Sequence, residues 1–232
     1  MAGARQTAVR AGRGELSRTR KATVLLREMI ISSRLPPGSM HLESDLAVLL
    51  GMSRTLVREA AIALAARGLV EVRPRRGIRI LPIAAEDMEE IYSILTELES
   101  LAAWQAAKAG VPQSDLKEMR ALIDAMDRAL ARDDRPAWAE ADAEFHRKLV
   151  RLAGNRRLEQ VVATFSDQVQ RARLVTLYLR PAPSRSNRDH RRLVDALAAA
   201  DPGAAREIHR AHRLEAKALM IDLIRKLGVG SV

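Results

Sequence analysis

Apolar residues recur at helical spacing on both sides of Gly51. Before this glycine, Leu46, Leu49 and Leu50 follow helical spacing, and Gly51 stands where a glycine commonly ends a helix. After it, the i, i+3, i+4, i+7 pattern of a buried helix face occurs at Val57, Ala60, Ala61 and Leu64. Ser53 can cap this second helix, because a serine side chain accepts a hydrogen bond from a free backbone N–H there. The pattern predicts two helices joined by a tight turn.

The polar side of the second helix carries Arg54, Thr55 and Arg58. At about 100° per residue, these three side chains share a face near the start of the helix. In a helix-turn-helix, the N-terminal residues of the recognition helix reach base edges in the major groove of DNA. For this stretch alone, an ordinary amphipathic helix with solvated arginines is the alternative interpretation.

Two short alternating segments follow, at residues 69–73 (LVEVR) and 77–81 (GIRIL). A turn of Pro74, Arg75, Arg76 and Gly77 joins them, and this combination predicts a β-hairpin. A hairpin with arginines at its tip, directly after a helix-turn-helix, is typical of a wing. Such a tip can follow phosphates or enter a narrow minor groove.

Every segment after Pro82 has helical periodicity and none has a strand pattern. Short breaks separate six predicted helices, at residues 88–109, 114–132, 135–153, 158–179, 189–200 and 202–227. We therefore expect a mainly α protein, in which a winged helix-turn-helix of three helices and a β-hairpin wing precedes an all-α bundle. The expected division is a disordered basic arm at residues 1–20, a DNA-binding domain at 21–82 and an all-α domain at 83–232.

Charge is distributed unevenly between these parts. The chain has a net charge of +10, and residues 1–82 hold 15 basic and 6 acidic side chains, against 24 and 23 in residues 83–232. A basic domain indicates a polyanionic partner. No basic amphipathic helix suited to a lipid surface is apparent, so double-stranded DNA is favoured over a membrane.

Composition excludes several other classes. No apolar run is long enough to span a membrane and no secretion signal is apparent, so we expect a cytoplasmic protein. The absence of cysteine rules out disulfides and thiol chemistry. Aromatic residues make up only 3% of the chain, which argues against stacking of single-stranded nucleic acid.

The histidines of the helical part form a second pattern. Asp142 and His146 are four residues apart on one predicted helix, His190 lies near the start of another, and His209 and His212 lie on the last. Three imidazoles and one carboxylate suit a divalent ion such as Zn²⁺, Ni²⁺, Mn²⁺ or Fe²⁺. Spacing alone leaves two questions open: whether the helices converge on an ion at all, and whether His209 or His212 takes part.

Together these segments resemble the GntR family of bacterial transcription regulators, in the subgroup whose helical C-terminal domain is called FCD. The resemblance covers roughly residues 21–228. It is carried by RLPPGS (34–39), DLAVLLGMSRTLVREA (45–60), GLVEVRPRRG (68–77), DAEFHRKLVRLAGN (142–155), DHRRLVDAL (189–197) and the RAHR around His212.

The resemblance implies roles for individual residues. The positions that match DNA contacts are Ser53, Arg54, Thr55 and Arg58 on the recognition helix, with Arg76 and Gly77 at the wing tip. Arg75 joins the candidate DNA contacts as the other arginine of the hairpin turn. Arg54 and Arg58 are the expected readers of guanine. The metal ligands of the FCD domain match Asp142, His146, His190 and His212, and His209 falls outside that pattern as a neighbour. In the family, the carboxylate of a small organic-acid effector occupies the open positions of the ion.

Two positions depart from the family pattern. Ser44 stands where many relatives have an arginine that contacts DNA, and Leu95 stands where many have an arginine in the helical domain. Arg171 and Arg173 are candidate replacements for binding the effector, although a solvated surface position is the alternative for both.

The expected function is therefore that of a ligand-responsive regulator, by default a repressor, which binds a pseudo-palindromic operator as a homodimer. A metal-dependent enzyme with a DNA-binding anchor is one alternative, but no nucleophile or general-base motif supports it. A DNA-binding protein with a structural ion and no effector is another.

Overall fold

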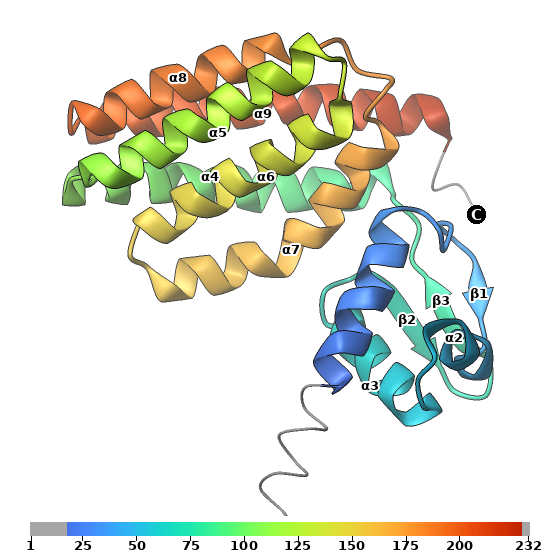
Figure 1. Ribbon diagram of the computed structural model, residues 1–232. Coiled ribbons are helices and arrows are strands. Elements are labelled where there is room, and N and C mark those ends of the chain that lie inside the picture. Colours follow the sequence, from blue (N-terminus) through green and yellow to red (C-terminus); the bar gives the residue numbers. More distant parts are fainter. Residues whose placement is uncertain (1–17, 229–232) are drawn as a thin grey trace, which may run out of the picture. The chain divides into compact units, whose positions relative to one another are not determined.

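The computed structural model describes residues 18–228, which form two compact units divided between Pro82 and Ile83 (Figure 1). We describe each unit by itself. No helix among the described residues is long and apolar enough to cross a membrane.

The N-terminal unit contains three helices and a small antiparallel sheet. A first helix at residues 18–31 precedes α2 (Glu43–Leu50) and α3 (Arg54–Ala65). The strands β1 (Met40–His41), β2 (Val70–Arg73) and β3 (Gly77–Ile80) pair in the order β1-β3-β2. Residues 18–20, which we had expected to belong to the arm, are already helical, and the rest of the expected arm lies outside the described residues.

The helix-turn-helix forms as the pattern predicts. Gly51 ends α2 in the left-handed conformation, with φ of 62°, and Ser53 Oγ accepts a hydrogen bond from the backbone N–H of Leu56 at 3.3 Å. The predicted apolar face of α3 is buried and packs against the first helix and the sheet. This packing leaves the start of α3 exposed.

The hairpin is confirmed, but the sequence analysis missed its third strand. β1 has only two residues, too few to show alternation, and pairs with β3 through Met40 opposite Arg79 and His41 opposite Ile78. Gly77 makes this pairing possible. Its φ is 100°, and a Cβ there would lie 2.3 Å from the carbonyl oxygen of His41. The wing is therefore bonded to the segment that leads into α2.

The C-terminal unit is all helical in its described part, as expected. Its helices are α4 (Ala85–Ala109), α5 (Gln113–Ala131), α6 (Arg135–Leu152), α7 (Arg156–Val175), α8 (Ser184–Ala198) and α9 (Pro202–Leu227). The long helices α4 and α9 run side by side, α5 packs against α6 and α8, and α7 packs against α4 and α6 (Figure 1). The interior is thus enclosed by helices from distant parts of the sequence.

Two predicted helix boundaries in this unit are wrong by four or five residues, and the others differ by three residues at most. The helix expected at 158–179 ends at Val175, because the later apolar residues Tyr178 and Leu179 are exposed and do not continue a buried face. The helix expected from 189 begins at Ser184. Its first turn is polar, so it shows no apolar period, and it is fixed by a tertiary contact of Asn187. His190 therefore lies well inside a helix rather than at its start.

Candidate nucleic-acid interface and metal centre

A groove on the N-terminal unit is lined by α2, the start of α3 and the hairpin turn. Its lining residues include five of the positions predicted to contact DNA, namely Ser44, Arg54, Arg58, Arg75 and Gly77. The other three, Ser53, Thr55 and Arg76, are exposed and do not line it. Arginines from two separate elements thus face one hollow, which suits a polyanion.

One acidic side chain lines the same groove. Glu43 Oε1 lies 3.8 Å from Arg58 Nε, in a pair whose arginine is largely exposed. An exposed pair of this kind contributes little stability. Arg58 can therefore exchange Glu43 for a phosphate or a base at small cost.

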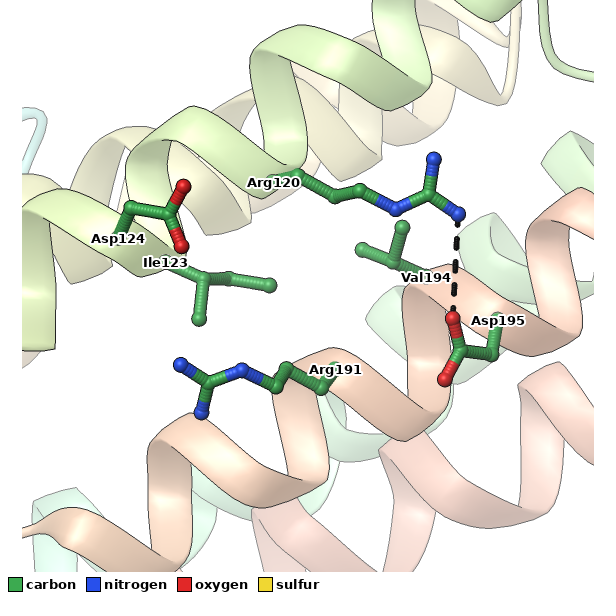
Figure 2. A pocket seen from close by; sticks show the side chains of 6 residues that line it. All are labelled: Arg120, Ile123, Asp124, Arg191, Val194 and Asp195. Carbon is green, nitrogen blue, oxygen red and sulfur yellow. Dashed lines mark ion pairs between the residues drawn. The ribbon is translucent and has the colours of Figure 1, made fainter.

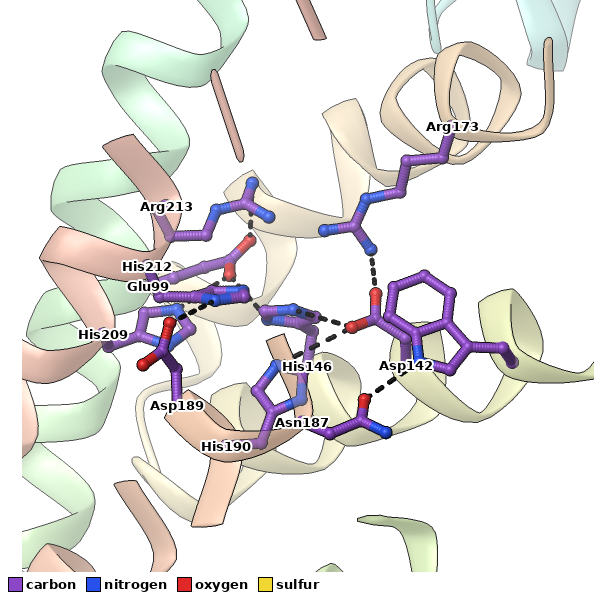
Figure 3. A network of polar contacts seen from close by, with 11 residues as sticks. Glu99, Asp142, His146, Arg173, Asn187, Asp189, His190, His209, His212 and Arg213 are labelled. Carbon is purple, nitrogen blue, oxygen red and sulfur yellow. Dashed lines mark hydrogen bonds and ion pairs between the residues drawn. The ribbon is translucent and has the colours of Figure 1, made fainter. Parts of the chain in front are cut away.

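The histidines predicted to bind an ion converge in the C-terminal unit (Figure 3). Asp142 and His146 come from α6, His190 from α8 and His212 from α9, and all four are buried. The imidazole centroids of His146 and His190 are 5.3 Å apart, and those of His190 and His212 are 4.8 Å apart. The structure thus brings together the whole quartet, which spacing in the sequence could not show.

Asp142 divides its two carboxylate oxygens between different partners. Oδ2 accepts a hydrogen bond from the Arg173 guanidinium, while Oδ1 lies 3.7 Å from His146 Nε2 and 3.6 Å from His190 Nε2. Burial alone would raise the pKa of Asp142, but the charge of Arg173 holds it well below its usual range. The carboxylate is ionised and presents one oxygen to the imidazoles.

Several polar atoms of this quartet lack hydrogen-bond partners among the described residues. They are Asp142 Oδ1, both ring nitrogens of His146 and both ring nitrogens of His190. Buried polar atoms without partners are costly, and among these atoms Asp142 Oδ1 faces the Nε2 atoms of His146 and His190. Burial, with the charge of His212, also lowers the pKa of His190 well below its usual range, so the ring is neutral. The neutral imidazole of His190 beside an ionised carboxylate fits a divalent cation.

Residues around the quartet orient it. Asp189 Oδ2 lies 3.8 Å from His212 Nδ1. Asn187 accepts a hydrogen bond from Trp138 Nε1 at 2.9 Å and donates one to Asp127 at 2.7 Å, which fixes the first turns of α8. Carboxylates and amides in such outer positions commonly hold metal-binding histidines in orientation.

Glu99 on α4 belongs to the same cluster, and the sequence analysis missed it. It is buried, and its Oε2 lies 3.1 Å from both His146 Nδ1 and His209 Nε2, while Arg213 lies 3.4 Å from Oε1. Burial would raise the pKa of Glu99, but Arg213 and the histidines hold it well below its usual range. A charged residue on the buried face of α4, between Leu95 and Ala103, was the available signal.

The predicted effector-binding arginines are both buried, so neither lies on the solvated surface. Arg173 reaches the cluster through Asp142. Arg171 is buried on the same helix. Leu95 is buried as well, one turn before Glu99.

A hollow in this unit lies between α5 and α8 (Figure 2). Both arginines that line it are paired, Arg120 with Asp195 at 3.8 Å and Arg191 with Asp127. Because these charges are already compensated, the histidine cluster is the stronger candidate site.

Comparison with known proteins matches both units. The model of bacterial regulatory proteins of the gntR family matches residues 19–80, and the FCD domain model matches residues 90–215. The chain is 40% identical over 130 residues to an HTH-type transcriptional regulator in the TAR-I ttuE-ttuC' intergenic region of Agrobacterium vitis, a match covering 55% of this chain and 76% of that protein.

Two further matches extend over more of the chain. It is 35% identical over 176 residues to a probable D-xylose utilization operon transcriptional repressor of Paenarthrobacter nicotinovorans, covering 76% of each protein. Its fold is similar to that of E. coli McbR/YncC, with a TM-score of 0.77 at 20% identity, covering 88% of this chain and 97% of that one.

Proposed function

The chain belongs to the GntR family of bacterial regulatory proteins and carries an FCD domain, and on this premise we propose that it is a metal-dependent, carboxylate-responsive repressor. The role in transcription regulation follows from the family, because the matched relatives are transcriptional regulators and not enzymes. The observation that carries the proposal is the buried convergence of Asp142, His146, His190 and His212.

The DNA-binding half of the proposal rests on the groove of the N-terminal unit. Arg54 and Arg58 at the start of α3 read guanine edges, while Arg75 and Arg76 at the hairpin turn contact phosphates or the minor groove. Two copies of the chain pair so that two such units read the half-sites of a pseudo-palindromic operator.

The sensing half rests on the histidine cluster. Asp142 through Oδ1 and the three imidazoles hold one divalent ion, of the group Zn²⁺, Ni²⁺, Mn²⁺ and Fe²⁺. An ion held there would supply a Lewis acid to which the carboxylate of a small organic acid would bind. Arg173 keeps Asp142 ionised and adds positive charge beside the ion.

The effector acts through a difference in affinity. It lowers DNA binding only by as much as it prefers the arrangement of the dimer that does not bind the operator. A structural ion without an effector is the competing interpretation, because the same quartet could hold an ion that has no exchangeable position.

The test combines thermal stability with DNA binding. Purified protein is screened against small carboxylates with and without a chelator, and each hit is added to an operator-binding titration. We expect one chemical class of acid to raise the melting temperature and weaken DNA binding, and both effects to disappear with chelator and in His190→Ala.

The matched control is His41→Ala, which removes the one histidine outside the cluster. This variant should retain the full response to the acid. If metal-loaded protein shows no shift with any carboxylate, the ion is structural and the sensing half of the proposal is wrong.

A further inference from the structure

The histidine cluster contains a second set of ligand atoms, on the other side of His146 from Asp142. It consists of Glu99, His146 and His209, whose exposed fractions are 4%, 7% and 1%. One ligand atom from each residue lies within 4.8 Å of the others. Figure 3 shows Glu99 and His209 facing His146 from the long helices α4 and α9.

The spacing of this set fits a bound ion. An ion held at about 2.0–2.1 Å keeps neighbouring ligand atoms about 2.8–3.0 Å apart in octahedral geometry and about 3.3–3.4 Å apart in tetrahedral geometry. Glu99 Oε2 is 3.1 Å from both His146 Nδ1 and His209 Nε2. The corresponding distances from Asp142 Oδ1, 3.6 and 3.7 Å, are slightly wider than such an edge.

The two nitrogens of His146 face the two sets separately. Nε2 faces Asp142 and Nδ1 faces Glu99. His146 Nδ1 comes within 3.1 Å of the Glu99 oxygen without hydrogen-bond geometry, whereas His209 Nε2 is hydrogen-bonded to the same oxygen at 3.1 Å and would exchange this bond for the ion. A buried imidazole nitrogen without a hydrogen-bond partner, such as His146 Nδ1, can serve as a metal ligand.

Charge limits how many ions the cluster holds at once. The carboxylates of Asp142 and Glu99 are matched by the guanidiniums of Arg173 and Arg213, and Asp189 adds one negative charge at the edge. One divalent ion leaves a small positive excess that an anion can cancel. A second would bury several uncompensated charges, which is costly.

We propose that Glu99, His146 and His209 form a second position for the divalent ion, alternative to the one formed by Asp142, His146, His190 and His212. Glu99 and His209 then bind the ion when it leaves His190 and His212, and His146 belongs to both positions. The inference rests on the metal half of the proposed function and adds nothing to the identity of the effector.

The experiment measures Zn²⁺ binding by calorimetry to metal-free, full-length protein. Wild type is expected to bind one ion per chain. A double variant with His190→Ala and His212→Ala is expected to bind one ion still, at least about tenfold more weakly, because three protein ligands replace four. Adding His209→Gln to the double variant should abolish this binding, whereas adding His41→Gln, the matched control, should leave it unchanged.

Three results would overturn the second position. They are loss of all binding in a double variant that stays helical by circular dichroism, no further effect of His209→Gln in that variant, and two ions bound per chain of wild type. If the double variant does not fold, His190→Gln replaces it, and the absorption of bound Co²⁺ reports whether the ligand set has changed.

The same data separate this inference from the proposed function. Wild type that binds no ion contradicts both. A normal carboxylate response together with failure of the double variant to bind Zn²⁺ contradicts the second position alone.

Discussion

At the scale of single residues, the hairpin turn combines backbone strain with charge. Arg75 has φ of 62°, a left-handed conformation that is unfavourable for a residue with a Cβ. A glycine would adopt this conformation without strain, yet the chain places an arginine there, in the lining of the groove. Because the backbone gains nothing from this choice, the guanidinium is the part that we expect to matter.

Arg75→Gly therefore tests the wing without disturbing the turn. We expect the melting temperature to stay equal or rise slightly, while DNA affinity falls and the slope of log affinity against log salt decreases by about one. The measurement is a DNA-binding titration at several salt concentrations.

Two comparisons make that result specific. Arg75→Lys keeps the charge and should bind nearly as wild type does. Arg54→Ala should weaken binding to the operator more than binding to random DNA, because a base contact carries sequence information and a phosphate contact does not. An unchanged salt slope in Arg75→Gly would remove Arg75 from the interface.

Residue chemistry also explains which parts of the metal site could be predicted. Histidines are rare in this chain, so His146, His190 and His212 were easy to identify, and Asp142 was identified because it lies four residues before His146. Glu99 did not, because a glutamate is common on helices and its burial depends on how α4 packs against α9. The sequence could not show that Arg173 and Arg213 hold the two carboxylates either, since both pairs join residues far apart in the chain.

At the scale of elements, the helices with a clear apolar period were predicted well and the exceptions have local causes. The expected bounds of the last helix, 202–227, are those observed, because Asp201 caps it and Pro202 begins it. The start of α8 was missed because its first turn is held by side-chain contacts of Asn187 instead of an apolar face. β1 was missed because it exists only through pairing with β3.

Asn187→Ala tests whether that contact positions α8. It leaves Trp138 Nε1 buried without a partner, so we expect a loss of roughly 1–3 kcal/mol in the free energy of unfolding. Because His190 lies one turn later, ion affinity should fall as well. Urea denaturation and Zn²⁺ titration provide the two readouts.

The control for this variant is Ser184→Ala at the exposed first position of the same helix. It should change neither quantity appreciably. If Asn187→Ala lowers stability but leaves ion affinity at the wild-type value, the network supports the fold without orienting His190.

At the scale of the whole helical unit, buried histidines make stability depend on pH. Burial lowers the pKa of His190, His209 and His212, in the case of His209 to about 3, whereas Asp142 raises that of His146 against the effect of burial. A histidine with a lowered pKa in the folded state gives stability that is complete above its unfolded pKa of about 6.5 and is lost as pH falls.

We therefore expect the metal-free protein to lose stability as pH falls from about 6.5 toward about 3, the pKa of His209 in the folded state. His209 faces Glu99, His146 and His212, and its share is about 1.4 kcal/mol per pH unit below 6.5. His146, whose pKa is raised, is protonated in both the folded and the unfolded state below about pH 6.5, so it adds no slope in this range. Urea denaturation in the presence of a chelator at a series of pH values measures the slope.

His209→Gln should reduce this slope, and His41→Gln should not. A slope that is the same in His209→Gln and in wild type would mean that His209 takes up a proton in the folded state as readily as in the unfolded chain.

The close approach at Gly77 restricts how such a protein can diverge. Any side chain at this position meets the His41 carbonyl and breaks the bond between the hairpin and the strand before α2. Gly77 therefore fixes the angle between the hairpin and α2. We expect related chains that bind other operators to keep this glycine and to differ in the side chains that line the groove, at positions such as Ser44, Arg54, Arg58 and Arg75.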